Sequence, residues 1–400
     1  MATVLLAYEF GAGLGHLNRL SAVAARLRGS HRLVFALPDM SLAAGLRRDF
    51  GDDAEIREGV HWPPPTDANA RKIPTHTFAD VIRLFGFDDV ERLVGNAERW
   101  LTLLAEVKPD LIVADFAPTL RLASGGRIPT IIVGNGYTVP PGSQPLPRLR
   151  PWETVIPPLS RAHEGRLLGG VNEARARLKG AAVDHFADLF QGEETFVCTI
   201  AEFDPYGDRR QAPVLWPFNI PAVESGGPLS ERQGPAAFAY FQRNHPALGQ
   251  VMASLSALGR RSEIYVQGAD PVEMAKGAGR SVGIHRRPAD FGKVLPSSGV
   301  LIHHAGLGTA SAGLMAGIPQ IVLPVNLEHT LTARGLALFG VATHLPLPPQ
   351  LDAPKLTSAF ARALEDGQMQ AAALDAAAEL HRRRDPDPVG RVVQAAGALL

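Results

Sequence analysis

Residues 301–334 constrain the fold of this chain more than any other part of the sequence. An apolar run bounded by glycine at 299–302 predicts a buried parallel strand. A turn with two glycines follows at 303–309, small apolar residues at 310–316 predict a helix, and a second apolar run covers 320–323. Strand, turn, helix and strand in this order predict a parallel sheet flanked by helices.

The turn after the first of these strands has the character of an anion-binding site. Unpaired backbone N–H groups at a helix start and the helix dipole both favour a negatively charged ligand. His304 and the hydroxyl of Thr309 would add side-chain donors for a diphosphate, although Thr309 is also a natural N-cap. Glu328 and His329 follow the next strand and suit sugar hydroxyls at the same sheet edge, although Glu328 is also placed as a helix N-terminal carboxylate. The pattern predicts a nucleotide-sugar site.

This stretch resembles the donor-binding signature of the GT-B glycosyltransferases, above all the nucleotide-diphosphosugar family that includes plant glucosyltransferases and bacterial macrolide glycosyltransferases. The family pattern is matched at His304, Gly306, Gly308, Thr309, Gly317-Ile318-Pro319, Pro324 and Glu328-His329. Two positions depart from it: His329 replaces the usual Gln, and Ala312 replaces a Glu that holds the ribose in many members.

The resemblance implies a donor site for UDP- or TDP-sugars. Its residues would be His304, Gly306, Leu307, Gly308, Thr309, Glu328 and His329, with Arg287 in the loop that reads the base. No cofactor and no metal ion are implied. Adjacent histidines, His303 and His304, are a poor metal site, because neighbours on a turn rarely bind one ion and no carboxylate lies three or four positions on. One should face the ligand and the other the core, and the motif register selects His304.

Length and composition describe an ordinary globular protein of two domains. Lys+Arg and Asp+Glu both number 40, so no basic balance points to nucleic acid or to a membrane surface. The single Cys198 excludes an internal disulfide and a cysteine-cluster metal site. We expect neither a membrane-spanning helix nor a signal peptide, because no apolar run approaches roughly 20 residues and residues 1–6 lack a basic region. A soluble cytoplasmic monomer or homodimer is expected.

The N-terminal residues predict a βαβ unit. Residues 4–7 and 32–37 predict strands, with apolar residues at helical spacing between them. Glycines in the first loop fit a dinucleotide fingerprint, but its third position is His16 and only Asp39 offers an acid after the next strand, which disfavours a Rossmann dehydrogenase. In the resembling family such a loop ends in the histidine that deprotonates the acceptor, a position that His16 occupies.

Residues 111–114 predict a buried strand, and Asp115 stands at its C-terminal end, where open α/β sheets place their ligands. In the resembling family an Asp after this strand pairs with the loop histidine. Asp115 would then orient His16 and stabilise the imidazolium formed after proton abstraction. The alternative is that Asp115 caps the next helix through Thr119.

The resemblance places the acceptor, a small molecule or a glycan, among the loops of the N-terminal half. The residues implied are Gly13, Gly15, Phe78, Phe85, Asn135 and Tyr137. For the aromatic residues at 75–87, the alternative is that they pack a satellite core. The proline-rich segment 140–158 predicts a surface loop without regular structure.

The expected fold class is α/β: a GT-B arrangement of two Rossmann-like βαβ domains whose parallel sheets face each other across an interdomain cleft. The predicted domains are 1–215 for the acceptor and 235–385 for the donor, with a linker at 216–234. Residues 386–400 predict an amphipathic helix that could pack back on the first domain.

The predicted activity is inverting, metal-independent transfer of a sugar to an acceptor hydroxyl or amine. Three alternatives stay open: a nucleotide-sugar epimerase of the same fold, the lipid-linked N-acetylglucosaminyl transferase of peptidoglycan synthesis, and a catalytically silent nucleotide-sugar-binding partner. The epimerase would need carboxylates placed for elimination. The lipid-linked enzyme would need a basic and apolar patch that docks on a membrane. The silent partner would not need the pair of His16 and Asp115.

Overall fold

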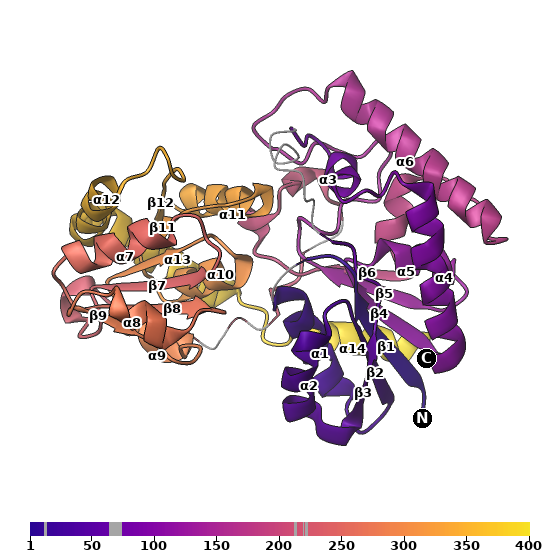
Figure 1. Cartoon of the computed structure of the whole chain (residues 1–400), viewed down its shortest axis with the longest axis horizontal. Helices are drawn as coiled ribbons and strands as arrows, with labels where there is room; N and C mark the ends of the chain where they lie inside the picture. Colours follow the sequence, from indigo (N-terminus) through magenta and orange to yellow (C-terminus); the bar gives the residue numbers. More distant parts are fainter. Residues whose placement is uncertain (12–13, 64–73, 212–213, 219, 221–222) are drawn as a thin grey trace. The chain divides into compact units, whose positions relative to one another are not determined.

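The computed structural model describes every residue except 12–13, 64–73, 212–213, 219 and 221–222. The chain divides into two compact units (Figure 1). The first comprises Met1–Asn219 and Asp385–Leu400, and the second comprises Ile220–Arg384. The C-terminal segment therefore leaves the second unit and completes the first.

Six parallel strands form the sheet of the first unit, in the order β3-β2-β1-β4-β5-β6. They are β1 (Thr3–Tyr8), β2 (Arg32–Leu37), β3 (Ala54–Glu58), β4 (Leu111–Asp115), β5 (Thr130–Gly134) and β6 (Glu194–Val197). The central strands β1 and β4 are buried on both faces, which explains why their sequences are unbroken apolar runs.

Helices cover both faces of this sheet. The helices of this unit are α1 (Gly15–Leu27), α2 (Ala43–Phe50), α3 (Phe78–Leu84), α4 (Val90–Val107), α5 (Pro118–Ser124), α6 (Pro158–Arg177) and, from the C-terminal segment, α14 (Pro388–Leu399). Helix α6 packs on α4, and α3 packs on α6. Helices α1, α2 and α14 pack on one face, in a core that includes Leu20, Phe35 and Val392. Figure 1 shows α4 and α5 on the opposite side of the sheet.

The second unit repeats the winding of the first, with the strand order β12-β11-β10-β7-β8-β9 and parallel pairing throughout. Its strands are β7 (Ala237–Gln242), β8 (Ser262–Gln267), β9 (Val282–Ile284), β10 (Val300–His303), β11 (Gln320–Val322) and β12 (Ala342–His344). Its helices are α7 (Leu248–Ala257), α8 (Pro271–Lys276), α9 (Phe291–Ser297), α10 (Leu307–Met315), α11 (Leu327–Leu338), α12 (Ala353–Glu365) and α13 (Gly367–Arg383). Helices α7 and α12 bury their apolar faces against one side of the sheet.

Each sheet has one point where the strand order reverses. In the first unit it lies between β1 and β4, and in the second between β7 and β10. Doubly wound parallel sheets bind ligands beyond the carboxyl ends of the strands at this point. The fold therefore marks one candidate site in each unit before any side chain is considered.

In the described parts of 51–95 the chain forms β3, α3 and the start of α4. Apolar residues at helical spacing predict a helix only from Ala97, but α4 begins at Val90. Asp89 sets this earlier start, because its carboxylate accepts a hydrogen bond of 3.1 Å from the backbone N–H of Arg92.

Helix α6 is also longer than its sequence pattern indicates. A helical pattern is clear only at 174–178, but the helix begins at Pro158, a residue type suited to the first turn. At 140–157, all described, the chain forms neither an α-helix nor a β-strand, as its prolines predict.

Candidate active site

The candidate catalytic pair lies at the reversal point of the first sheet. His16 is the second residue of α1, which follows β1, and Asp115 is the last residue of β4. Because Tyr8 pairs with Asp115 across the two parallel strands, the loop after β1 and the end of β4 meet at one edge. His16 Nδ1 lies 2.9 Å from Asp115 Oδ1. The structure thus brings together the two residues that were predicted as a catalytic pair.

Asp115 is fully buried and faces two nitrogen-bearing side chains. Its Oδ2 accepts a hydrogen bond of 2.7 Å from Arg19 Nε, and its Oδ1 faces His16. Burial raises the pKa of Asp115, whereas the charge of Arg19 and, after it, His16 lower this pKa. The net result is a pKa below the ordinary value for an aspartate. In the tautomer with its proton on Nδ1, His16 faces the charged carboxylate with that proton and Nε2 is basic; in the other tautomer Nδ1 accepts from Arg19 Nη2 at 3.3 Å. The alternative in which Asp115 caps α5 is wrong, because the first N–H groups of α5 donate to Glu9.

Glu9 is the acceptor for four N–H groups. The backbone N–H groups of Thr119 and Leu120 lie 3.3 and 2.6 Å from its carboxylate oxygens. The indole N–H groups of Trp62 and Trp100 lie at 3.1 and 3.0 Å. Burial raises the pKa of Glu9 to about 7, against these hydrogen bonds, which lower it. Glu9 thereby connects the loop after β1 to α4 and α5, a role that no pattern in the sequence indicates.

Two further contacts hold the His16 ring. The ring of Tyr8 stacks on it, with centroids 5.6 Å apart and planes 13° from parallel. Gly11 lies close to the basic nitrogen, since a Cβ there would fall 2.3 Å from His16 Nε2. The φ angle of Gly11 is +100°, which L side chains rarely adopt. Position 11 therefore requires glycine on both counts.

Phe78, Phe85 and Tyr137 belong to one aromatic cluster. Phe78 is fully buried and lies edge-on to Tyr137, with centroids 5.9 Å apart. Phe85 is half-buried and lies edge-on to Phe10 at 5.1 Å. Phe116 links the two groups, at 5.7 Å from Phe78 and 4.8 Å from Phe10. Phe78 packs in a core, which fits the satellite-core alternative, while Phe85 and Tyr137 keep part of their rings exposed.

The remaining predicted acceptor residues occupy loops and a helix start. Gly15 is the first residue of α1, where a Cβ would meet no described atom within 4 Å. Asn135 follows β5, and its Oδ1 accepts a hydrogen bond of 2.9 Å from the backbone N–H of Thr138. Gly13 lies outside the described residues. The acceptor-binding role of these positions stays a prediction.

The second unit separates its two adjacent histidines. His303 is fully buried, with Nδ1 accepting from the backbone N–H of Ala305 at 3.1 Å and Nε2 donating to Gln320 Oε1 at 2.8 Å. His304 is 7% exposed, yet within the described chain no group hydrogen-bonds its Nδ1. An unpaired buried nitrogen is costly unless a ligand or water meets it. Of the two, His304 is therefore the one free to contact a ligand.

His329 joins His304 at the start of α11. The helix is capped by Asn326, which accepts from the backbone N–H of His329 at 2.9 Å, and Glu328 lies in its first turn. The ring centroids of His304 and His329 are 4.7 Å apart, and His329 Nδ1 also lacks a hydrogen-bond partner among the described residues. Burial lowers the pKa of His304 to about 4 and that of His329 to about 3, with neighbouring histidines adding to both effects. Both rings are neutral at pH 7 and can each donate one hydrogen bond.

Gly306 is the N-cap of α10, so the expectation that Thr309 caps this helix is wrong. Leu307, Gly308 and Thr309 form the first turn, whose N–H groups have no partner within the helix. A Cβ at Gly306 would fall 3.1 Å from His304 Nε2, so glycine leaves room for the imidazole. A helix start with His304 beside it suits a phosphate group.

Arg287 lies apart from this group in the lining of a cavity of about 550 Å³. The wall also carries Arg261, Glu263 and Lys293, from β8, its approach and α9. His304 and the other predicted phosphate-site residues are not among the residues that line it. A role of Arg287 in reading the base stays a prediction.

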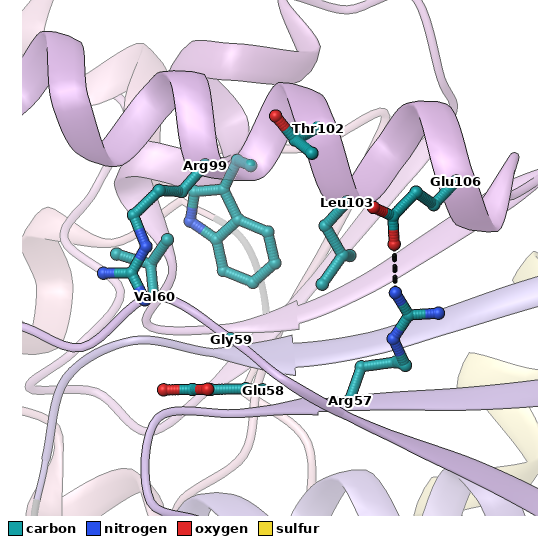
Figure 2. Close-up of a pocket in the computed structure, with 9 residues that line it drawn as sticks. Arg57, Glu58, Gly59, Val60, Arg99, Thr102, Leu103 and Glu106 are labelled. Carbon is teal, nitrogen blue, oxygen red and sulfur yellow. Dashed lines mark hydrogen bonds and ion pairs between the residues drawn. The ribbon is translucent and has the colours of Figure 1, made fainter.

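A second cavity, of about 310 Å³, lies in the first unit between the end of β3 and α4 (Figure 2). Arg57 and Glu106 form an ion pair at one end, and Arg99 and Glu58 lie toward the other. Its lining residues, all described, include none of the predicted site residues. Trp100, whose indole N–H bonds Glu9, forms part of the wall.

The described ranges contain neither a candidate metal site nor a membrane-spanning helix. In these ranges, no three or more His, Cys, Asp or Glu side chains are arranged to hold a metal ion. Nor is any helix there both long and apolar enough to cross a bilayer.

The C-terminal part of the chain is similar to a known protein family. Residues 285–396 match the family described as Erythromycin biosynthesis protein CIII-like, C-terminal domain. Tylactone mycaminosyltransferase of Streptomyces fradiae is 34% identical over 143 residues, 35% of this chain and 30% of that protein. The 10-deoxymethynolide desosaminyltransferase of Streptomyces venezuelae is 33% identical over 116 residues, 27% of this chain and 25% of that protein. The chain thus matches less than a third of the length of these relatives.

Solved structures extend the likeness along the whole chain. The calicheamicin glycosyltransferase CalG4 has a TM-score of 0.67 at 16% identity, covering 100% of this chain and 98% of its own. The spinosyn rhamnosyltransferase SpnG, complexed with spinosyn aglycone, has a TM-score of 0.66 at 18% identity, covering 98% and 100%. The glycosyltransferase VinC, in complex with DTDP, has a TM-score of 0.64 at 16% identity, covering 99% and 98%. The predicted GT-B fold is confirmed by these structures, and residues 285–396 are similar to the C-terminal domain of the Erythromycin biosynthesis protein CIII-like family.

Proposed function

We propose that this chain is an inverting glycosyltransferase that moves a sugar from a TDP- or UDP-sugar to a hydroxyl or amine of an acceptor bound in the first unit, without a metal ion. The observation that carries the proposal is the 2.9 Å approach of His16 Nδ1 to the buried carboxylate of Asp115. This arrangement leaves Nε2 able to take a proton. A silent binding partner has no need of such a base, and an epimerase would need carboxylates placed for elimination instead.

The reaction balances as a single displacement. The acceptor oxygen or nitrogen attacks the anomeric carbon while Nε2 of His16 takes its proton. The bond from that carbon to the diphosphate oxygen breaks, and its electron pair leaves with the diphosphate. Attack opposite the leaving group inverts the anomeric centre. Asp115 stabilises the imidazolium that results.

The second unit has groups suited to the leaving diphosphate. The first N–H groups and the dipole of α10 favour negative charge, and the imidazoles of His304 and His329 can donate hydrogen bonds. Because the pKa values of these histidines are about 4 and 3, both act as neutral donors. The scheme uses these donors where a metal ion would otherwise neutralise the diphosphate.

The comparisons suggest which substrates to test first. VinC is known in complex with DTDP, and SpnG in complex with thymidine diphosphate. The relatives from Streptomyces are named for sugar transfer to tylactone and 10-deoxymethynolide. We therefore place a TDP-sugar first among donors and a macrolide-type aglycone first among acceptors.

The test is turnover of TDP- and UDP-sugars with such aglycones by wild type, His16→Gln and His31→Gln. His16→Gln should lose about 10²–10⁴-fold in kcat, the usual contribution of a general base, and should bind TDP as tightly as wild type. His31→Gln is the matched control, because His31 lies just before β2, away from the carboxyl ends of the strands. NMR of the product should show the anomeric configuration opposite to that of the donor, and EDTA should not change the rate.

A separate result would contradict each of the three parts of the proposal, which are the base, inversion and metal independence. A His16→Gln enzyme within about tenfold of wild type would contradict the assignment of the base. A product with the configuration of the donor would contradict inversion, and loss of activity in EDTA would contradict metal independence.

A further inference from the structure

Arg19 is the third side chain around Asp115, and the proposed reaction gives it no role. Its side chain is 10% exposed, its Nε lies 2.7 Å from Asp115 Oδ2, and its Nη2 lies 3.3 Å from His16 Nδ1. His16 and Arg19 are one turn apart on α1, so a single helix carries the candidate base and a guanidinium.

The contacts show that Arg19 orients the carboxylate more firmly than His16 does. The hydrogen bond from Arg19 Nε to Asp115 Oδ2 is short and aligned. The approach of His16 Nδ1 to Oδ1 has the length of a hydrogen bond but lies off its direction. The hydrogen bond from Arg19 therefore fixes the orientation of the Asp115 carboxylate, and this orientation places Oδ1 next to His16.

The charges of these groups oppose protonation of His16. Arg19 is permanently cationic, and the buried Asp115 carboxylate offsets its charge. A proton on His16 would place a second cation with its Nδ1 only 3.3 Å from a guanidinium nitrogen. Like charges this close disfavour the charged form of a titrating group. The imidazolium is therefore harder to form than it would be beside Asp115 alone.

We propose that Arg19 is a positioning residue that fixes the Asp115 carboxylate toward His16 and keeps His16 unprotonated to a lower pH than Asp115 alone would allow. The consequence of this role for catalysis rests on the proposed function. The electrostatic effect of Arg19 on His16 needs no substrate and can be measured on the protein alone.

Other ionisable groups near this cluster come from β1, the end of β2 and the end of β6. Burial, and after it Asp39, raises the pKa of Tyr8 to about 12. Burial raises the pKa of Cys198 to about 12. Hydrogen bonds from Ser41 hold the pKa of Asp39 below its ordinary value. None of these three groups changes charge between about pH 5 and pH 9. Glu9, in the loop after β1, does change charge in this range, with a pKa of about 7, so the signal of the His16 ring itself is followed and the titration is repeated in Glu9→Gln.

The direct test follows His16 by NMR in protein labelled at histidine Cε1, with its signal assigned by loss in His16→Gln. The titration midpoint should rise by about 1–2 pH units in Arg19→Gln, because Asp115 then faces His16 without a competing cation. Arg19→Lys keeps a cation and should move the midpoint less. Arg26→Gln is the matched control on the same helix, where Arg26 pairs with Asp387 at the surface, and it should leave the midpoint unchanged.

Activity provides a second readout. The acid limb of the kcat/KM profile should move upward with the NMR midpoint, so that Arg19→Gln loses about tenfold or more at low pH and approaches wild type at high pH. A merely structural role would lower the rate at every pH and reduce the Tm without moving the His16 midpoint. An unchanged midpoint in folded Arg19→Gln overturns the proposal. If wild type turns over no sugar nucleotide, the proposed function fails, and the NMR titration still decides the role of Arg19.

A second variant decides the matter if Arg19→Gln does not fold. In Asp115→Asn, the Arg19 guanidinium faces His16 with no carboxylate to offset its charge, so the titration midpoint of His16 should fall by about 1 pH unit or more below that of wild type. A midpoint at or above that of wild type would overturn the proposal.

Discussion

His16 is held by residues that lie far from it in the sequence as well as by near ones. Its pairing with Asp115 was predictable, because each follows an apolar run typical of a strand and parallel strands end at a common edge. The contacts of Arg19 and Tyr8 with this pair were not predictable, because the spacing of residues in the sequence does not show which side chains turn toward a loop. For Tyr8, the structure supplies the answer, because Tyr8 pairs with Asp115 across β1 and β4. A basic residue one turn after His16 was the available signal for Arg19.

Gly11→Ala should disable the proposed base without removing it. The backbone there has a φ angle of +100°, and the added methyl group would lie 2.3 Å from His16 Nε2. We expect a backbone cost of about 1–3 kcal/mol in the free energy of unfolding and a loss of about 10²-fold or more in kcat. Gly95→Ala is the control, because it lies within α4, where a Cβ meets no described atom within 4 Å. Wild-type kcat in Gly11→Ala would contradict the close packing of His16.

His303 should make the second unit less stable in acid. Burial lowers its pKa to about 3, far below the unfolded value of 6.5. The unfolded chain therefore binds more protons as the pH falls below about 6.5, which reduces the free energy of unfolding by about 1.4 kcal/mol per pH unit. His303→Asn keeps an acceptor for the N–H of Ala305 but cannot titrate, so its denaturation profile between pH 6.5 and 4.5 should be less steep. Equal slopes for wild type and variant would show that His303 titrates normally when folded.

Elements with a single clear signal were predicted well, and elements with mixed signals were not. Apolar runs at 32–37 and 130–134 and the alternating residues at 262–267 predict strands, and β2, β5 and β8 cover the same residues. Residues 51–95 combine prolines, charges and aromatic side chains, which hid β3 and α3. Most of α6 was missed because its 20 residues form no continuous apolar stripe.

Glu9→Gln should loosen the connection between the loop after β1 and the helices α4 and α5. At pH 8, above the pKa of about 7, the carboxylate is charged and accepts four N–H groups. The amide nitrogen of Gln cannot accept, so some buried donors lose their partner, at a cost of about 2–4 kcal/mol in the free energy of unfolding. Glu98→Gln, an exposed position on α4, is the control. Equal denaturation midpoints for the two variants at pH 8 would contradict this role.

The two units have the same strand order, and each has its candidate site at the reversal point. The sequence predicted this fold because the motif within 301–334 resembles one family and the first strands show a βαβ rhythm. The site is less predictable, since the partners of His303 and Glu9 depend on which strand ends come together. The return of α14 to the first unit follows from an apolar face that includes Val392 and Ala396, both fully buried there.

Val392→Ala should destabilise the first unit although the residue follows the second unit in the chain. Its side chain is 0% exposed in the core that α14 shares with α1. Removing two buried methyl groups should cost about 2 kcal/mol in the free energy of unfolding. Leu400→Ala, at a position that is 43% exposed, should cost little. Equal effects of the two substitutions would contradict the packing of α14 in this core.

The measurement that tests the central claim most directly is a calorimetric titration with TDP and UDP of wild type, His304→Ala and His16→Ala. Wild type should bind at least one diphosphate saturably, in one-to-one ratio. His304→Ala should bind at least about tenfold more weakly, because an imidazole donor to the diphosphate is lost. His16→Ala should bind as wild type does, since the role proposed for His16 is toward the acceptor. If neither diphosphate binds wild type, or if His304→Ala binds equally well, the chain has the fold of a glycosyltransferase but not the donor site assigned to it.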